Sequence, residues 1–221
     1  LDKSATLRFM LRPDDTSYLS PVLSRYHHLD IQRGEGVYIY DAQGTAYLDF
    51  GSGIGVASTG HCHPTVVQAL QEQAATLIHP CIAVGNYPSL LTCAKQLCEL
   101  VGPEPYSVFF DQSGSGAVEA ALKLAKYVQN KHKIIAFSGG FHGRSMGALS
   151  VTSSKPAYQD RLGPMLEGVA HFPFPYCYRC PWDANPSTCK TAPCQEALLS
   201  SELFDDDVAA VIIEPILGEG G

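Results

Sequence analysis

The sequence has 221 residues, of which 45% are hydrophobic and 17% are charged, and its formal net charge is −7. This length suits one large domain, or one domain and part of another, with a sizeable core. The acidic balance excludes a broad nucleic-acid-binding protein, which needs a basic face, and no apolar run approaches the length that spans a bilayer.

The first predicted elements, in chain order, are a β-hairpin and a glycine-rich loop. Residues 36–41 and 45–50 are aromatic, β-prone runs, and the short link between them is typical of a hairpin. Residues 51–60 are rich in glycine and predict a loop over a site or an interface.

Two amphipathic helices are expected next. Pro64 suits the first position of a helix, and apolar residues recur at helical spacing from there to Leu77. The second helix is expected over residues 89–101, with leucines along one face.

A strand, a Gly/Ser loop and a helix form the most informative motif. Residues 106–110 predict a buried strand, and the loop after them opens an amphipathic helix over residues 117–126. Such a loop leaves free backbone N–H groups at the positive end of a helix dipole, where an anion binds.

The composition of this loop suits phosphate. Gly114 and Gly116 let the backbone approach an anion closely, and Ser113 and Ser115 offer hydroxyl donors. The Walker ending and the dinucleotide glycine spacing are both absent. The loop therefore predicts a phosphate-bearing ligand of another kind, with an ordinary strand-to-helix turn as the alternative.

The rest of the chain alternates apolar strands with helices or irregular segments. In chain order, the pattern predicts a strand over residues 133–137, a Gly/His loop over 138–147, a strand-like piece over 148–152, a Pro- and Cys-rich insert over 172–194, a helix over 195–204 and a strand over 208–213. This alternation indicates an α/β domain with a mostly parallel sheet, in which ligands bind at the carboxyl ends of the strands.

Two further groups follow strands and are candidates for the same site. Phe141 and His142 are flanked by glycines, so the aromatic ring is able to cover a planar heterocycle; the alternative is that Phe141 fills the core. Glu214 and Glu219 follow the last strand, where a carboxylate can pair with a cation or a bound amine; capping of a following helix is the alternative.

Four of the eight cysteines form a close group in the sequence. Cys177, Cys180, Cys189 and Cys194 lie in the irregular insert, where two close pairs suit tetrahedral thiolate binding of zinc or an iron–sulfur cluster. Plain thiols are the alternative. The remaining cysteines are expected to be buried thiols.

Together, the segments from about Gly34 to Gly221 resemble the class III aminotransferases, which use pyridoxal phosphate, with the 4-aminobutyrate aminotransferases as the nearest group. The hairpin, the glycine loop with residues 60–64, the Gly/Ser loop with its helix, residues 136–152 and the last strand look like the family's blocks, in the family's order.

The resemblance implies the fold of the pyridoxal-phosphate-dependent transferases, the aspartate-aminotransferase-like fold type I, in which helices flank a mostly parallel sheet. It implies that residues 1–50 belong to a small domain and residues 51–221 to an incomplete large, cofactor-binding domain. It also implies a cytoplasmic homodimer.

Residue by residue, the resemblance implies that Gly114 and Ser115 bind the phosphate of pyridoxal 5′-phosphate. It implies that Phe141 stacks on the pyridine ring beside His142. On the substrate side, the implied residues are Ile54, Glu214, in a gate that the family closes with an arginine, and Glu219.

Two departures from the family pattern matter. Position 116 is Gly where the family usually has an acidic residue, which predicts looser anchoring of the loop. The family's Schiff-base lysine, and the aspartate that holds the pyridine nitrogen protonated, come downstream of the last matching block, beyond Gly221. We therefore interpret the chain as an N-terminal fragment, inactive by itself.

The complete protein is expected to transfer an amino group from a donor such as 4-aminobutyrate to a 2-oxo acid such as 2-oxoglutarate. Within the family, the alternatives are ornithine, acetylornithine or a diamine as donor, or a decarboxylase or aminomutase. Outside it, they are a non-catalytic protein that binds a phosphate ligand and an interaction module organised by a metal at the cysteines.

Overall fold

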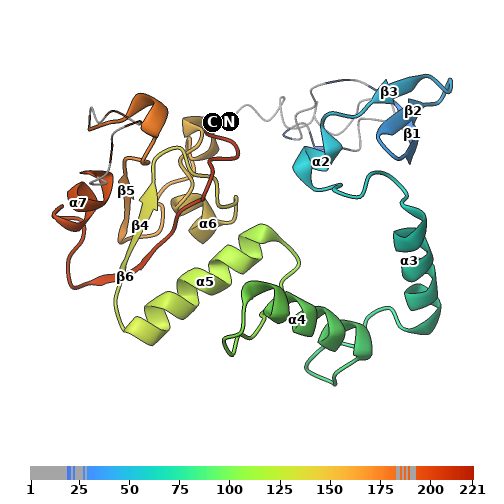
Figure 1. Ribbon diagram of the computed structural model, residues 1–221, viewed down its shortest axis with the longest axis horizontal. Helices are drawn as coiled ribbons and strands as arrows, with labels where there is room; N and C mark the ends of the chain where they lie inside the picture. The colour runs from blue at the N-terminus through green and yellow to red at the C-terminus, as the bar shows by residue number, and fades with distance from the viewer. Residues whose placement is uncertain are drawn as a thin grey trace, which may run out of the picture. The chain divides into compact units, whose positions relative to one another are not determined.

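The computed structural model describes residues 19, 20, 22, 27, 29–182, 185, 187, 189 and 193–221 (Figure 1). The chain divides into two compact units, Leu1–Pro88 and Ser89–Gly221. Each unit contains a three-stranded sheet. The boundary that the sequence analysis expects near residue 50 separates the small and large domains of a longer protein, and it stays a prediction. Residues 1–18 of the expected small domain lie outside the described residues.

The first unit contains the predicted hairpin. Its strands are β1 (Ile31–Glu35), β2 (Tyr38–Asp41) and β3 (Ala46–Leu48), and β2 pairs antiparallel with both neighbours. The Asp41 carboxylate accepts hydrogen bonds from the backbone N–H groups of Gln43 and Thr45, at 3.0 and 2.8 Å, and so fixes the turn. The hairpin is confirmed, whereas β1 carries too little apolar alternation to be predicted.

The glycine-rich loop contains a short left-handed turn, α2 (Ser52–Gly55). Ser52, Gly53, Ile54 and Gly55 all have positive φ, between 45° and 74°. One Asp49 carboxylate oxygen accepts hydrogen bonds from the N–H groups of Gly51 and Ser52, each at 2.9 Å, which supports the turn. A β-branched residue such as Ile54 rarely adopts this conformation.

The helices α3 (Pro64–Thr76) and α4 (Pro88–Val101) confirm the two predicted helices. Their apolar faces are not buried in the described structure. Leu70 of α3 is 65% exposed and Leu100 of α4 is 82% exposed.

The second unit is built on a parallel sheet in the order β5–β4–β6. Its strands are β4 (Lys133–Phe137), β5 (Val169–Phe172) and β6 (Val208–Val211). Besides α4, it contains the helices α5 (Gly114–Gln129), α6 (Met146–Ser150) and α7 (Pro193–Leu199). Two 3₁₀ turns, η1 (Pro156–Tyr158) and η2 (Cys177–Arg179), lie in the connections.

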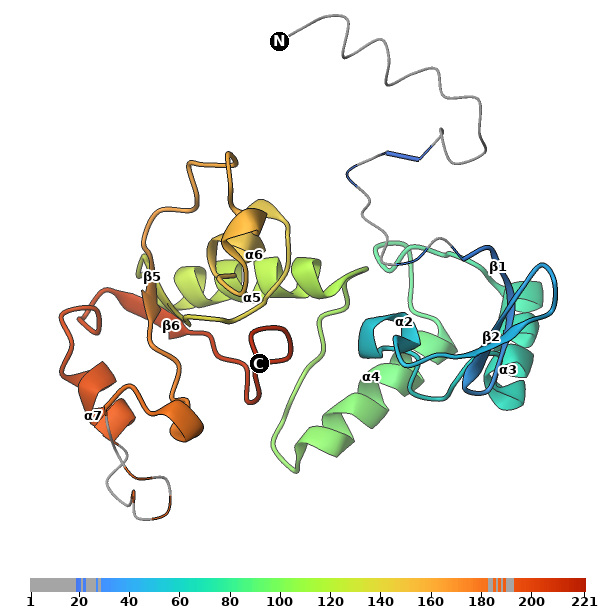
Figure 2. The same ribbon diagram turned by 90° about the horizontal axis from the view of Figure 1, so that it is seen from above.

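Both faces of β4 are packed, because successive side chains of a strand point to opposite faces. Ile134 and Ala136 pack with Leu122 of α5 in one core cluster, and Ile135 and Phe137 belong to a second cluster. The partly buried neighbours in the second cluster include Trp182 and, from α7, Ala197 and Leu198. Accordingly, α5 and α6 lie on one side of the sheet and α7 lies on the other (Figure 2). The predicted α/β class and parallel sheet are confirmed.

Two predicted strands are wrong. Residues 106–110 form no strand in the described structure, and Phe109 is 71% exposed, because no neighbouring strand is present to pair with them. Residues 148–152 form the end of the buried helix α6 and the turn after it, since a short apolar run does not distinguish a strand from a buried helix. In contrast, β5 lies in a stretch for which the sequence analysis predicted no element. None of the described helices is long and apolar enough to cross a membrane.

Candidate functional site

The candidate site lies where β4 and β6 end. Because these strands are parallel, the loop after β4 and the segment after β6 leave the sheet at the same edge. The Arg144 N–H, in the loop after β4, donates a hydrogen bond to Ser115 Oγ at 3.1 Å. The start of α5 therefore lies against the same loop.

The predicted phosphate loop forms the capped start of α5. Ser113 Oγ accepts a hydrogen bond from the Gly116 N–H at 3.0 Å, and the Ala117 N–H bonds to the Ser113 carbonyl oxygen. The first N–H groups of a helix have no partner within it, so those of Gly114 and Ser115 are available to an anion. A Cβ placed on Gly114 would have no atom within 4 Å apart from its chain neighbours and the backbone of its own helix, so the start of α5 is uncrowded at this position.

Glycine at position 116 has a physical reason in this chain. A Cβ placed there would lie 1.8 Å from one carboxylate oxygen of Asp111. Any larger residue would therefore require Asp111 to move. The expected looser anchoring of the loop stays a prediction; in the structure, Ser113 caps the helix start.

The predicted aromatic loop is held by hydrogen bonds from both of its sides. The Phe141 N–H donates to Glu214 Oε1 at 2.5 Å, and the His142 N–H donates to the buried Thr152 Oγ1 at 2.8 Å. The Phe141 ring meets the Tyr158 ring edge-on, with centroids 5.8 Å apart. It belongs to neither buried core cluster, which disfavours the core-filling alternative.

His142 carries a buried polar atom of its own. Its Nε2 has no hydrogen-bond partner among the described residues, and the same holds for His171 Nε2 on β5. Burial lowers the pKa of both imidazoles, and the nearby Glu214 carboxylate partly opposes the shift of the His142 pKa. Both rings are thus held neutral over a wider pH range than a free histidine.

Glu214 and Glu219 have different surroundings. The two oxygens of Glu214 accept from the backbone N–H groups of Phe141 and Gly218, the second at 2.9 Å. Glu219 accepts from Ser154 Oγ at 2.6 Å, Lys155 Nζ at 2.7 Å and Tyr158 Oη at 2.6 Å. Burial opposes ionisation of Glu219, but these three donors lower its pKa to about 2.

Glu119 is a residue that the sequence analysis missed. Its Oε1 atom accepts from Ser145 Oγ at 2.7 Å and from the N–H groups of Gly147 and Ala148 at 2.8 and 3.1 Å. Burial opposes its ionisation, yet these hydrogen bonds lower the pKa of Glu119. Glu119 stands one helical turn after Ser115 on α5, and this spacing was the available signal that it faces the same loop.

Ile54 lies in the other unit, Leu1–Pro88, where its residue surface is 92% exposed. Its expected place near a substrate stays a prediction.

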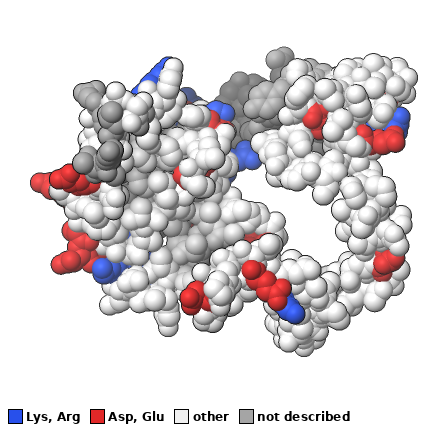
Figure 3. Space-filling view, viewed as in Figure 1, with Lys and Arg blue, Asp and Glu red and all other residues white. Residues whose placement is uncertain are grey.

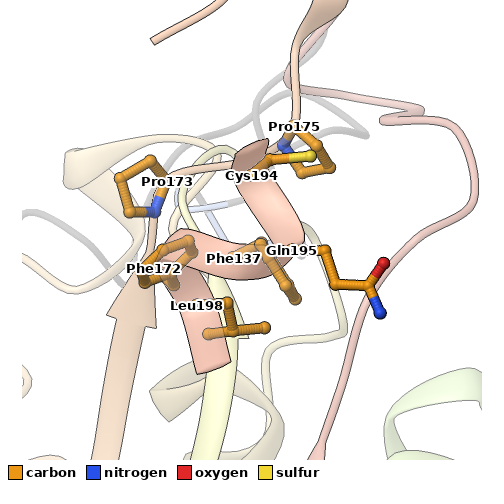
Figure 4. A pocket seen from close by; sticks show the side chains of 7 residues that line it. All are labelled: Phe137, Phe172, Pro173, Pro175, Cys194, Gln195 and Leu198. Atoms are coloured by element: carbon orange, nitrogen blue, oxygen red, sulfur yellow. The ribbon is translucent and has the colours of Figure 1, made fainter. Parts of the chain in front are cut away.

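The cysteine group is not assembled into a metal centre in the described part of the chain. Cys177, Cys180, Cys189 and Cys194 are free thiols, and no described group of three or more His, Cys, Asp or Glu side chains is suited to a metal. Cys194 instead borders a small apolar pocket of about 170 Å³ on the side of α7, lined by Phe137, Phe172, Pro173, Pro175, Gln195 and Leu198 (Figure 4). Of the cysteines expected to be buried, Cys62, Cys81 and Cys93 are exposed and Cys98 is half-buried.

A family model and individual relatives both match this chain to aminotransferases. The family model described as "Aminotransferase class-III" matches residues 20–221. A 2-aminoadipate transaminase of Pseudomonas putida is 35% identical over 204 residues, which are 92% of this chain and 48% of that protein. An acetylornithine aminotransferase of Methanopyrus kandleri is 39% identical over 188 residues, which are 85% of this chain and 43% of that protein.

The solved structures that resemble this chain are also transaminases. The ω-transaminase from Pseudomonas jessenii in complex with PMP has a TM-score of 0.74 and 28% identity, over 99% of this chain and 49% of that one. The ornithine aminotransferase from Toxoplasma gondii has a TM-score of 0.74 and 26% identity, over 100% of this chain and 50% of that one. The chain therefore spans about half the length of the relatives it matches.

Proposed function

Because this chain belongs to the class III aminotransferases, we propose that the full-length protein containing it transfers an amino group from an amine donor to a 2-oxo acid, with pyridoxal 5′-phosphate as cofactor. The predicted fold type I is confirmed by the match to solved transaminases. The observation that carries the proposal is the family match over residues 20–221.

The described residues fit this cofactor. The N–H groups of Gly114 and Ser115 would bind its phosphate, and the uncrowded start of α5 at Gly114 leaves room for that group. When bound, the cofactor supplies an electron sink for the carbon next to the amine. Phe141 would lie on its ring, because Glu214 holds the Phe141 backbone beside the loop that reaches Ser115. His142 would offer its unpaired Nε2 there.

On the substrate side, we assign Glu214 to the gate and Glu219 and Ile54 to the lining of the pocket. For Glu214 to act in the gate, its carboxylate must break its hydrogen bonds to two backbone N–H groups. Glu219 forms an ion pair with Lys155. None of the lysines of this chain is assigned to the chemistry. The lysine and aspartate that complete the site are expected beyond Gly221.

Among donors, we propose 4-aminobutyrate, with ornithine, acetylornithine or a diamine as the alternatives. The names of the relatives include 4-aminobutyrate, acetylornithine, 2-aminoadipate and 5-aminovalerate aminotransferases, so the donors to compare are those of these relatives. A homodimer in the cytoplasm is the proposed setting.

The test is a donor panel on the purified full-length protein with 2-oxoglutarate as acceptor. Cofactor loading is measured first, by absorbance. Turnover with 4-aminobutyrate supports the proposal in full, and turnover with another donor corrects the substrate only. Cofactor binding without turnover on any donor would contradict a transaminase and favour a non-catalytic binding protein. The 221-residue chain alone is expected to give no turnover.

A further inference from the structure

Tyr158 is the described side chain that contacts both halves of the candidate site. It ends the 3₁₀ turn η1, and its hydroxyl donates to Glu219 Oε1 at 2.6 Å. Its ring meets the Phe141 ring edge-on, at 5.8 Å between centroids and an interplanar angle of 65°. The carboxylate on the substrate side and the aromatic ring on the cofactor side thus share one neighbour.

The segment that carries Tyr158 is fastened to the aromatic loop. The N–H groups of Ser153 and Ser154 donate to the Gly140 carbonyl oxygen, at 2.8 and 3.0 Å. At the other end of the segment, the Gln159 side-chain amide donates to the carbonyl oxygens of Leu149 and Thr152, at 2.9 and 2.7 Å. Both ends of the segment that carries Tyr158 are therefore held by hydrogen bonds: one end to the aromatic loop, and the other to α6 and the turn after it.

The three donors to Glu219 are not equivalent. The Lys155 side chain is 51% exposed, so its ion pair with Glu219 is weakened by solvent. Tyr158 is partly buried, and its aromatic side chain has few rotamers, so its hydroxyl gives the carboxylate a fixed direction. Ser154 Oγ holds the other oxygen, Oε2, so without the Tyr158 hydroxyl the Oε1 atom of Glu219 would keep only the exposed Lys155 as a donor.

We propose that Tyr158 is a positioning residue that sets the Glu219 carboxylate relative to the Phe141 ring, and hence the bound amine donor relative to the cofactor. This inference rests on the proposed function. The hydroxyl acts on the substrate side and the ring acts on the cofactor side, so two substitutions separate the two contributions.

The experiment uses the full-length protein with Tyr158→Phe, Tyr158→Leu and the matched control Tyr178→Phe. Tyr178 is 80% exposed and pairs with Tyr176, outside the site. Three quantities are measured: the Kd of pyridoxal 5′-phosphate by absorbance titration, the donor KM and kcat, and the Tm.

For Tyr158→Phe, we expect the donor KM to rise about tenfold, the usual cost of losing a hydrogen bond to a charged group, with kcat, cofactor Kd and Tm near wild type. For Tyr158→Leu, the cofactor Kd should also rise, about fivefold, because the edge-on ring contact is lost. Tyr178→Phe should match wild type throughout.

Two results would overturn the inference. The first is a donor KM in Tyr158→Phe equal to that of Tyr178→Phe. The second is a parallel fall of Tm, kcat and cofactor affinity in Tyr158→Phe, which would mark a purely structural role. An inactive wild-type protein overturns the proposed function instead, and the cofactor Kd of Tyr158→Leu then still tests the ring contact by itself.

Discussion

At the scale of single residues, Glu119 joins α5 to the loop that leads into α6. It accepts three hydrogen bonds with one carboxylate oxygen, all from residues 145–148. Glu119→Ala leaves these donors without their acceptor, so we expect the free energy of unfolding to fall by about 2 kcal/mol. Glu119→Gln keeps a carbonyl oxygen and should lose less. Urea unfolding followed by circular dichroism measures both, and equal losses would contradict the hydrogen-bond account.

The two half-buried histidines, His142 and His171, predict a pH dependence of stability. Burial lowers the pKa of His142 and His171 from the ordinary 6.5. Above pH 6.5 both states hold neutral rings; below it the unfolded state binds protons that the folded state resists, so stability falls as pH falls. The slope is at most about 1.4 kcal/mol per pH unit for each histidine.

Urea unfolding between pH 7.5 and 5.5 checks this expectation. Glu119 and Glu219, with pKa values lowered from 4.5, lose their stabilising contribution only at pH below that value, so their effect falls outside the range. His171→Gln should flatten the profile. A profile that is already flat in the wild type would contradict the assignment.

The residues whose places in the fold agree with the sequence analysis are those placed by their neighbours along the chain. Ser113 caps the helix α5, Gly114 begins it, and the Glu214 carboxylate follows the strand β6. Tyr158 and Glu119 gave weak signals because their partners, Glu219 and Ser145, are far away in sequence. Such pairs depend on the tertiary fold, and a single sequence does not encode them locally.

At the scale of elements, the helices with strong periodicity and the strands β4 and β6 were predicted close to their observed bounds. The errors fall on segments whose state depends on a partner. Residues 106–110 have strand-like composition but no described strand beside them. The run at 148–152 forms the end of α6 and the turn after it, where Leu149 and Val151 are buried. Composition alone does not resolve either case.

The left-handed turn α2 predicts a stabilising substitution. Ile54 has φ 64° and is 92% exposed, so replacing it removes backbone strain and little burial. Asparagine tolerates this conformation, and we expect Ile54→Asn to raise the free energy of unfolding by about 1 kcal/mol. The control is Ile78→Asn, at an isoleucine that is 85% exposed and has no positive φ.

Urea unfolding of both variants decides the question, and an equal change in the two would contradict the strain argument. If Ile54 also contacts the donor chain, as proposed, the stabilised variant should show a changed donor KM in the full-length protein. The backbone strain at Ile54 would then be the cost of placing this side chain for donor binding.

At the scale of the whole molecule, the described chain carries much exposed apolar surface. Phe109, Leu124 and Tyr127 are 71%, 63% and 86% exposed, and they line one apolar groove along α5. On the face shown in Figure 3, uncharged surface predominates and the charged residues are scattered. Patches of this kind are rare on stable monomers.

We therefore expect the 221-residue chain, expressed alone, to self-associate and to bind a hydrophobic dye. Size-exclusion chromatography with light scattering and dye fluorescence measure this. The double variant Leu124→Ser with Tyr127→Ser should reduce both signals relative to Leu162→Ser, a change at a half-exposed leucine outside the groove. A monomeric chain that binds no dye would contradict the expectation.

The hydrogen bond between the Phe141 N–H and Glu214 also has a consequence for synthesis on the ribosome. The two residues are 73 positions apart, and Tyr158 and Glu219 are 61 apart. A nascent chain that has emerged only as far as β5 contains Phe141 and Tyr158, but neither Glu214, which accepts from the Phe141 N–H, nor Glu219, which accepts from the Tyr158 hydroxyl. These contacts therefore form only after β6 has joined the sheet, so we expect cofactor capture to follow the emergence of that strand rather than accompany the folding of α5.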